Sequence, residues 1–352
     1  MRETAMNDKK KLLLIGPLPE PIGGVSIHIA RLSDLLKNQF AIKYIDESPN
    51  NKPEIFNIRS LNILKYIKLI LWADIVHIHS GVTLFRILHL TLSKLFRRKT
   101  IVTMHSLSHQ TPTLIKINSL FLKLADTIIL VSKEIQNSLK VPSPIIKEAF
   151  IPPSMENEPE IPQHITQWIK HQKDKQRTII SANASKITLH HNVDLYGFDL
   201  CIESIAHLIN VLKVNVCLIL IIGSKKNSVD LLEKYNTAIE LHDLKDSVLL
   251  SIENISFARI ISASDIVLRP TCTDGDALTI REAIFLNKKI IASDVVKRPP
   301  ETIIFKNRDT KDLCTKIYDN LPRTNTSISN EVTYTTEDYL EFYENIYNSN
   351  ET

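Results

Sequence analysis

Short apolar runs alternate with longer amphipathic segments along the first 151 residues. The apolar runs have strand length: KLLLIG (11–16), DIVHIH (74–79), KTIVTMH (99–105), DTIILVS (126–132) and PIIKEAFI (144–151). The segments between them have helical periodicity: 24–37, 60–72, 83–96 and 112–124. Continuous apolar runs are typical of strands buried on both faces, and their alternation with helices favours βαβ units. The pattern therefore predicts an α/β domain with a parallel sheet.

A second series of the same kind follows a break. Residues 152–163 are rich in proline and acidic residues and have no apolar period, which predicts a linker. After it come strand-like runs at 177–182, 215–223, 247–251, 265–270 and 288–294, and helical patterns at 198–212, 228–241 and from 278. We expect domains at 1–151 and 164–330, a terminal segment at 331–352 with a helix over 335–348, and two Rossmann-like domains facing across a cleft.

Composition excludes several classes of protein. Of the 352 residues, 43% are hydrophobic and 23% charged, so the chain can bury a core. The net charge of +4 is too small for a dedicated nucleic-acid binder. Four cysteines without C-x-x-C spacing favour a reduced, cytoplasmic compartment. The longest apolar run, 216–222, has strand length, so we expect no membrane span or signal peptide.

Glycine is scarce: the chain has seven, where an average chain of this length has about 25. We expect the remaining glycines mainly where a side chain cannot be accommodated. Three of them, Gly16, Gly81 and Gly223, follow strand-like runs, and Gly23 and Gly24 precede a helical pattern. These are the strand-to-loop edges at which α/β sheets bind ligands.

The segment TCTDGDALTIREA (271–283) follows a strand and opens a helix. Helix-start amides attract anions, and Gly275 lets the backbone approach one closely. Asp274 and Glu282 are eight residues apart, and a carboxylate two turns into the helix can accept both hydroxyls of a ribose. The alternative is an ordinary helix start with acidic capping residues.

Gly23 and Gly24 stand directly before another helical pattern, in GPLPEPIGGVSIHIARL (16–32). The segment has neither G-x-G-x-x-G nor G-x-x-x-x-G-K-[ST], which argues against an NAD oxidoreductase and against a P-loop. A tight turn with a helix cap is the alternative explanation.

Histidines form a third group. His77 and His79 lie on one face of a strand, and His105 ends the next strand. No carboxylate or cysteine accompanies them, so we predict no metal site, and we expect His77 to be a hydrogen-bonded core histidine.

The stretch IISASDIVLRPTCTDGDALTIREAIFLNKKIIASDV resembles the donor-site motif of the group 1 (family 4) retaining glycosyltransferases of the GT-B fold, with its E-x7-E pattern. The resemblance implies that Glu282 binds the nucleotide ribose, that Asp274, in place of the usual glutamate, lies against the transferred sugar, and that His105 lies beside that sugar. It also implies that Gly23 and Gly24 lie near the donor diphosphate and that the terminal helix crosses back to the first domain. The segment whose amides would hold the phosphates is Gly275, Asp276, Ala277, Leu278 and Thr279.

The chain departs from that family in one place. The family commonly has an arginine and a lysine after the first strand of its second domain, which neutralise the diphosphate. Here Asn183 stands at the arginine position and Tyr196 at the lysine position. We expect Lys186 or Arg269 to supply the charge, because a diphosphate leaves poorly without a cation.

Residues 61–71 and 84–99 combine apolar faces with lysine and arginine. Such helices can rest on an anionic bilayer, or they can pack on a sheet with snorkelling basic ends. Together with the family's habit, they favour a lipid-linked saccharide acceptor in surface polysaccharide biosynthesis, at the inner face of the cytoplasmic membrane.

We therefore predict a retaining, metal-independent hexosyltransferase that uses a nucleotide diphosphate sugar. Two alternatives remain: a non-catalytic GT-B partner subunit, which the departure at Asn183 and Tyr196 would suit, and a sugar-nucleotide epimerase. Transfer by the purified protein alone separates the first alternative, and product formation without acceptor separates the second.

Overall fold

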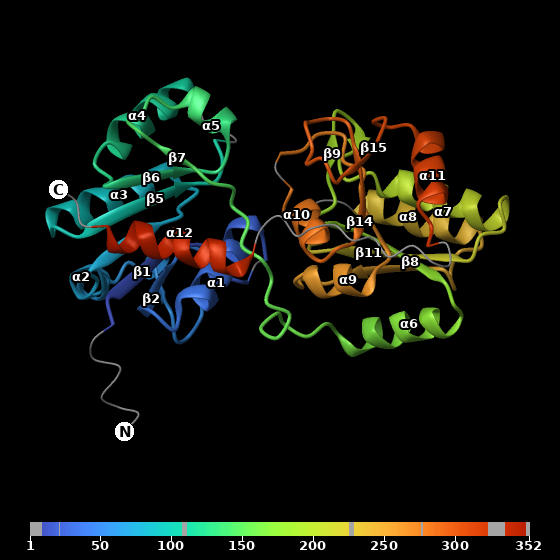
Figure 1. Ribbon diagram of the computed structural model, residues 1–352, viewed down its shortest axis with the longest axis horizontal. Coiled ribbons are helices and arrows are strands. Elements are labelled where there is room, and N and C mark those ends of the chain that lie inside the picture. Colours follow the sequence, from blue (N-terminus) through green and yellow to red (C-terminus); the bar gives the residue numbers. More distant parts are fainter. Residues whose placement is uncertain are drawn as a thin grey trace. The chain divides into compact units, whose positions relative to one another are not determined.

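The computed structural model describes residues 9–20, 22–107, 111–224, 229–275, 277–322 and 335–349 (Figure 1). The chain divides into two compact units. Unit 1 comprises Met1–Ile151 and Thr335–Thr352, and unit 2 comprises Pro152–Tyr334. The segment after residue 334 thus returns to the unit formed by the first 151 residues.

Unit 1 is built on a parallel sheet that has seven strands within its described residues, in the order β3-β2-β1-β4-β5-β6-β7. The strands are β1 (Lys11–Gly16), β2 (Ala41–Asp46), β3 (Phe56–Asn57), β4 (Ile75–Ile78), β5 (Lys99–Met104), β6 (Thr127–Leu130) and β7 (Ile145–Ile146). The helices are α1 (Gly24–Leu36), α2 (Ile63–Trp72), α3 (Thr83–Leu95), α4 (Pro112–Leu122), α5 (Lys133–Ser138) and α12 (Thr336–Asn348), with a 3₁₀ turn at Ile58–Ser60. The predicted strand at 144–151 is much shorter than expected, because only Ile145 and Ile146 pair with β6.

Unit 2 has a six-stranded parallel sheet in the order β12-β11-β8-β13-β14-β15, counted over the residues described. Its strands are β8 (Thr178–Ala184), β11 (Val216–Ile222), β12 (Val248–Ile252), β13 (Ile266–Arg269), β14 (Lys289–Ser293) and β15 (Ile303–Phe305), besides the antiparallel pair β9 (Leu189–His190) and β10 (Val193–Asp194). Its helices are α6 (Gln163–Asp174), α7 (Phe198–Asn210), α8 (Val229–Leu241), α9 (Ala258–Ala263), α10 (Leu278–Phe285) and α11 (Thr310–Asp319).

Helices cover both faces of the unit 2 sheet, which explains its uninterrupted apolar strands. Along β11, Leu218, Leu220 and Ile222 join a core with α7, α8 and α11, whereas Cys217 and Ile219 join a second core with α6, α9 and α10. Since successive strand side chains point to opposite faces, both sets are buried. The apolar runs identified in this part of the sequence are confirmed as strands, and burial on both faces explains why they are apolar throughout.

The order of strands positions the ligand-binding edge in each unit. From β1 the chain builds outward through β2 and β3, and then returns to the other side of β1 with β4 and β5. Unit 2 does the same around β8, with β11 and β12 on one side and β13, β14 and β15 on the other. Open α/β sheets bind ligands beyond the carboxyl ends of the strands at such reversals. These edges follow Gly16 and Ile78 in unit 1, and Ala184 and Arg269 in unit 2.

The terminal helix α12 packs on unit 1 through one face. Tyr339, Tyr343 and Tyr347 are four residues apart and are each 1% exposed. The hydroxyl of Tyr347 lies 2.6 Å from His77 Nδ1, and that of Tyr343 lies 3.4 Å from His28 Nε2. The helix therefore buries its tyrosines against residues of α1 and β4.

Candidate functional site

A buried ion network lies at the carboxyl edge of the unit 2 sheet. Arg269, the last residue of β13, donates from Nε and Nη2 to the two carboxylate oxygens of Asp274, each at 3.0 Å. Arg298, which follows β14, donates from Nη1 to Asp274 Oδ2 at 3.0 Å, and Thr271 donates to the same oxygen at 3.1 Å. Within this three-residue network the two guanidinium groups exceed the one carboxylate by one positive charge.

The charge balance also appears in the ionisation of Asp274. Burial alone would raise the pKa of its carboxyl, but the charges and hydrogen bonds of Arg269 and Arg298 outweigh that cost and lower the pKa. Asp274 is therefore ionised at neutral pH and holds both guanidinium groups in place. The sequence prediction included Arg269 and Asp274 but missed Arg298.

The loop after β13 leads into α10. Ala277, the residue directly before α10, makes no side-chain hydrogen bond that caps the helix. Asp276 lies outside the described residues. The second helical residue, Thr279, donates from Oγ1 to Asn183 Oδ1 at 2.9 Å, which ties the helix start to the end of β8. Glu282 lies one turn further along and is 3% exposed. Asn183 is thus engaged with the helix start, at the position where the resembled family has arginine.

Tyr196 and Gly197 bring a second loop to the same edge. The guanidinium of Arg269 lies 5.4 Å from the centroid of the Tyr196 ring, and the Tyr196 hydroxyl lies 2.8 Å from Ser185 Oγ. Tyr196, which stands where the resembled family has lysine, therefore contacts the guanidinium of Arg269 with the face of its ring. Lys186 is exposed and forms no ion pair with any residue the structure describes.

The glycines fall into two groups, and only one agrees with our expectation. A Cβ on Gly16, Gly197 or Gly223 would lie within 3.0 Å of another atom, whereas one on Gly23, Gly24, Gly81 or Gly275 would meet nothing within 4 Å. The expectation that glycine persists mainly where a side chain cannot fit is wrong for the second group. Packing of the protein does not explain glycine at those positions, which include every glycine assigned to donor binding.

We predict that Gly197→Ala destabilises unit 2 by roughly 2–4 kcal/mol, because its φ of +68° is left-handed and a Cβ would lie 2.3 Å from the Pro270 carbonyl oxygen. Urea denaturation in a Trp72→Phe background, which leaves Trp168 as the reporter of unit 2, measures the effect. The matched control is Gly275→Ala, whose stability should stay within about 1 kcal/mol of the parent. Equal stability of the two variants would contradict this packing argument.

In unit 1, Gly23 and Gly24 stand at the start of α1. The Gly23 N–H donates to Ser26 Oγ at 2.8 Å, and the Ser26 hydroxyl donates to the Gly23 carbonyl at 3.0 Å. Ser26 thus stabilises the helix start from within the helix. The glycine pair precedes His28 on the same helix.

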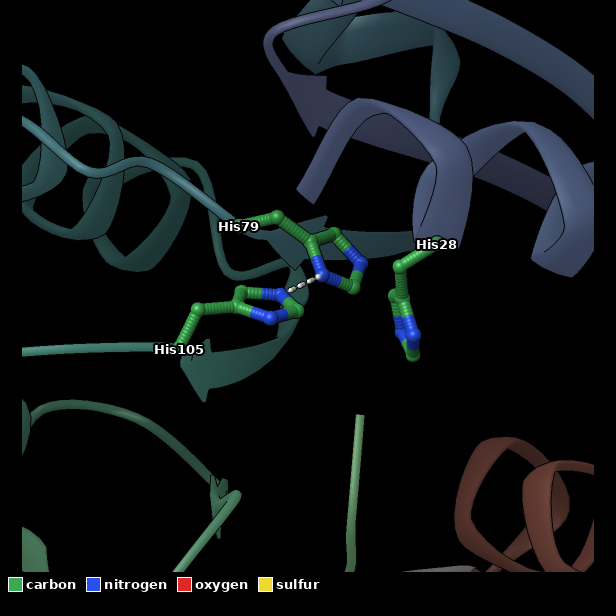
Figure 2. A group of neighbouring side chains, drawn as sticks. All are labelled: His28, His79 and His105. Atoms are coloured by element: carbon green, nitrogen blue, oxygen red, sulfur yellow. Dashed lines mark hydrogen bonds between the residues drawn. The ribbon is translucent and has the colours of Figure 1, made fainter. Parts of the chain in front are cut away.

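His28 belongs to a group of histidines at the carboxyl edge of the unit 1 sheet (Figure 2). His79 follows β4 and His105 follows β5, and His79 Nδ1 lies 3.1 Å from His105 Nε2. Burial lowers the pKa of His28 to about 4 and lowers the pKa of His79 and His105 well below the usual 6.5, so all three are neutral at pH 7. His77 accepts or donates at both nitrogens, to Tyr347 and to Thr103 at 2.8 Å, which confirms the predicted core role.

The two basic helices are only partly available to a membrane. Lys65 and Lys68 on α2 are exposed, as are Leu64 (75%) and Leu84 (71%). Of the two alternatives for residues 84–99, Arg86 fits packing within the protein and not contact with a bilayer. It is 1% exposed and donates to Asn118 Oδ1 and the Ser80 carbonyl, each at 2.6 Å.

Lys99 also has another role, because its ammonium group donates to the Ile346 carbonyl at 2.6 Å and thereby holds the end of α12. A search of the described residues finds no helix with the length and apolar character needed to cross a membrane.

The chain matches no protein-family model, and no curated protein matches it in sequence. It is similar to solved structures. A glycosyltransferase from Rickettsia africae has 13% identity, covers 98% of this chain and 100% of its own, and gives a TM-score of 0.64. Anabaena HepE in complex with UDP-glucose has 13% identity over 88% of this chain and 89% of its own, with a TM-score of 0.61.

A third structure, sucrose-phosphate synthase from Thermosynechococcus elongatus, has 14% identity over 88% of this chain and 89% of its own, with a TM-score of 0.60. At such identities the likeness establishes the fold. The two parallel-sheet units and these neighbours confirm the predicted α/β class with two Rossmann-like domains, the GT-B fold.

Proposed function

We propose that the protein is a glycosyltransferase that takes a sugar from a nucleotide diphosphate sugar. The observation that carries the proposal is the Arg269–Asp274–Arg298 network, which gives an excess positive charge at the strand reversal of unit 2 beside the start of α10. A diphosphate is the ligand that two guanidinium groups and helix-start amides bind best. HepE, which has the same fold, binds UDP-glucose.

In the reaction, the bond between the anomeric carbon and the diphosphate oxygen breaks, and negative charge develops on that oxygen. In the proposed reaction Arg269 and Arg298 stabilise this charge, which is the role that a metal ion would otherwise take. The acceptor oxygen bonds to the anomeric carbon from the face that the diphosphate leaves, with retention of configuration. Its proton passes to the departing diphosphate. Asp274 holds the two arginines and, by the resemblance, lies against the sugar.

The other predicted residues take the roles that the resemblance implies. The backbone amides of Gly275 to Thr279, Asp276 included, hold the phosphates, and Glu282 binds the ribose. In unit 1, His105 contacts the transferred sugar, and Gly23 and Gly24 contact the diphosphate. Lys186, in the loop after β8, supplies a further positive charge for the diphosphate. The open space around Gly23, Gly24 and Gly275 supports these assignments.

Thermal denaturation with a panel of nucleotide diphosphate sugars tests the proposal. A donor that binds the folded state must raise the melting temperature. The donor with the largest shift is then tested for transfer to a saccharide acceptor by the purified protein alone. If the donor binds but sugar transfer occurs only after a partner subunit is added, the non-catalytic alternative would replace the proposal.

We predict that Glu282→Gln weakens donor binding by roughly 1–3 kcal/mol, because the ribose hydroxyls lose a charged acceptor. Calorimetry with UDP, the nucleotide of the HepE complex, measures the change. Glu240→Gln, a change on the exposed side of α8, is the matched control. The variant must have the parent's melting temperature, which shows that it is folded. If it then binds UDP with the parent's affinity, Glu282 does not bind the ribose.

We propose that the acceptor of the sugar is a lipid-linked saccharide at a membrane surface. Helices that follow parallel strands begin at the carboxyl edge of the sheet, so the starts of α2 and α3 lie at the edge that carries His105. Tyr66 on α2 donates or accepts at 2.8 Å with His89 on α3, so the two helices are neighbours. Exposed leucine and isoleucine side chains near both starts, with Lys65 and Lys68, suit an anionic bilayer. They are Leu61, Ile63, Leu64, Leu84 and Leu88.

We predict that Leu64→Glu lowers binding to vesicles with anionic lipid by roughly tenfold, because one leucine leaves the apolar layer and a lysine charge is offset. The matched control is Leu241→Glu in unit 2, where the leucine is 79% exposed on α8. Co-sedimentation at two salt concentrations measures both variants. Equal binding by the parent and the two variants would leave the lipid-linked acceptor without support.

A further inference from the structure

Three histidines from separate segments converge at the strand reversal of unit 1. His28 comes from α1, His79 from the end of β4 and His105 from the end of β5, and one ligand nitrogen from each lies within 4.8 Å of the others. Figure 2 shows the three rings gathered around a common point, with each ring next to the other two. The ring centroids are 5.0–5.4 Å apart.

Hydrogen bonding accounts for only part of this cluster. The His79–His105 contact occupies one nitrogen of each ring. His79 is 1% exposed, and its Nε2 has no hydrogen-bond partner among the described residues. His28 is 2% exposed and interacts with the Ala149 backbone. A buried polar atom without a partner costs about 1–3 kcal/mol. Hydrogen bonds within the protein therefore leave the cluster incompletely satisfied, and one ligand nitrogen from each of its three rings lies close enough to the others to share an ion.

We propose that His28, His79 and His105 form a binding site for a divalent transition-metal ion of the Zn²⁺ class. Two nitrogens bound tetrahedrally to zinc at about 2.0–2.1 Å lie about 3.3–3.4 Å apart, so the His79–His105 pair needs to open by only a few tenths of an ångström. On metal binding the proton between the two rings moves to the outer nitrogen of the ring that donates it, so that both inner nitrogens offer a lone pair to the ion. His28 completes a set of three nitrogens, which leaves the fourth position of a tetrahedral ion open.

The chemistry of the cluster selects the metal. No carboxylate or thiolate from the described residues belongs to it, so Mg²⁺ and Ca²⁺, which prefer oxygen, are disfavoured. The charges of Arg31 and Arg86 oppose any cation at the cluster, so binding requires a metal with a strong preference for nitrogen ligands. The imidazoles are neutral at pH 7, so binding displaces few protons. Tyr343, 3.4 Å from His28 Nε2, orients that ring.

Metal binding is independent of the proposed function, but one consequence rests on it. His105 is the residue assigned to the transferred sugar, so an ion held by His105 competes with the donor. We expect a sugar nucleotide to bind more weakly to the protein when Zn²⁺ is present.

Titration of the full-length protein with Co²⁺ at pH 7 tests the site, because tetrahedral Co²⁺ absorbs visible light. We expect one ion per chain at micromolar concentration and displacement by Zn²⁺. His79→Phe and His105→Gln should each weaken binding roughly 100-fold. The double variant His190→Ala/His191→Ala, which removes two adjacent exposed histidines, should bind like the parent. Melting temperatures without metal establish that each variant is folded.

Binding that His79→Phe and His105→Gln leave unchanged, or that the His190/His191 control abolishes, would overturn the proposed site. The absence of stoichiometric binding at micromolar Co²⁺ and Zn²⁺ would do the same. If the site binds metal but UDP-glucose affinity stays constant with and without Zn²⁺, the metal site stands and the donor role of His105 fails.

Discussion

Arg298→Ala should lower the rate of sugar transfer by roughly 100-fold or more, and it should also destabilise unit 2, because Arg298 is one partner of a buried ion pair. The rate is therefore compared at a temperature where the melting curve shows the variant to be folded. The variant leaves Asp274 paired with Arg269 alone, so the excess positive charge of the three-residue network falls from one to zero. The network then has no net positive charge with which to stabilise the departing diphosphate, and loss of one preorganised donor at such a position costs about 10²–10³ in rate. Steady-state kinetics with the donor selected by thermal shift measures the change.

Two further variants make this result specific. Arg298→Lys restores the charge without the forked geometry and should recover part of the rate. Arg177→Ala removes an arginine that pairs with Asp246 just before β8, at the amino edge of the same sheet, and should keep the parent's rate. A full rate in Arg298→Ala and in Arg269→Ala would show that neither replaces the family's missing cations.

The fold could be predicted because most strands are buried on both faces. The run at 216–222 is apolar throughout, and every one of its residues is buried. Elements with weaker patterns were missed. Strand β2 (AIKYID) contains a lysine and is only partly buried, and α11 (TKDLCTKIYD) buries only Leu313, Cys314 and Ile317. Such segments form because tertiary packing completes them, and a local pattern carries too little of that information.

The site residues that were missed share one cause. Arg298 reaches Asp274 because β14 lies beside β13, and His28 reaches His79 because α1 follows β1, which lies beside β4. Sheet order brings these residues together, and no spacing in the sequence encodes it. The sequence analysis weighed His77 with His79, since they share one strand. In the structure the rings of His77 and His79 are indeed neighbours, with centroids 4.0 Å apart, but both nitrogens of His77 are occupied by Tyr347 and Thr103. The nitrogen partner of His79 is His105.

Acidification should unfold unit 1 before unit 2, because four neutral histidines are buried in unit 1. Burial lowers the pKa of His28 to about 4 and that of His77, His79 and His105 well below 6.5. The unfolded chain binds protons near pH 6.5, whereas the folded unit does not. The free energy of unfolding is therefore highest above pH 6.5 and falls as the pH drops toward 4. His28 alone contributes a loss of about 3 kcal/mol by pH 4.

Urea denaturation between pH 7 and pH 4.5 in a Trp168→Phe background measures this, since Trp72 then reports on unit 1 alone. His28→Gln removes one titrating group, and it should reduce the slope of the unfolding free energy by about 1.4 kcal/mol per pH unit between pH 6 and pH 4.5. The exposed variant His190→Ala should leave the slope of unit 1 unchanged. Equal slopes for the parent and His28→Gln would mean that His28 takes up its proton at the same pH in the folded and the unfolded chain, which would contradict the lowered pKa.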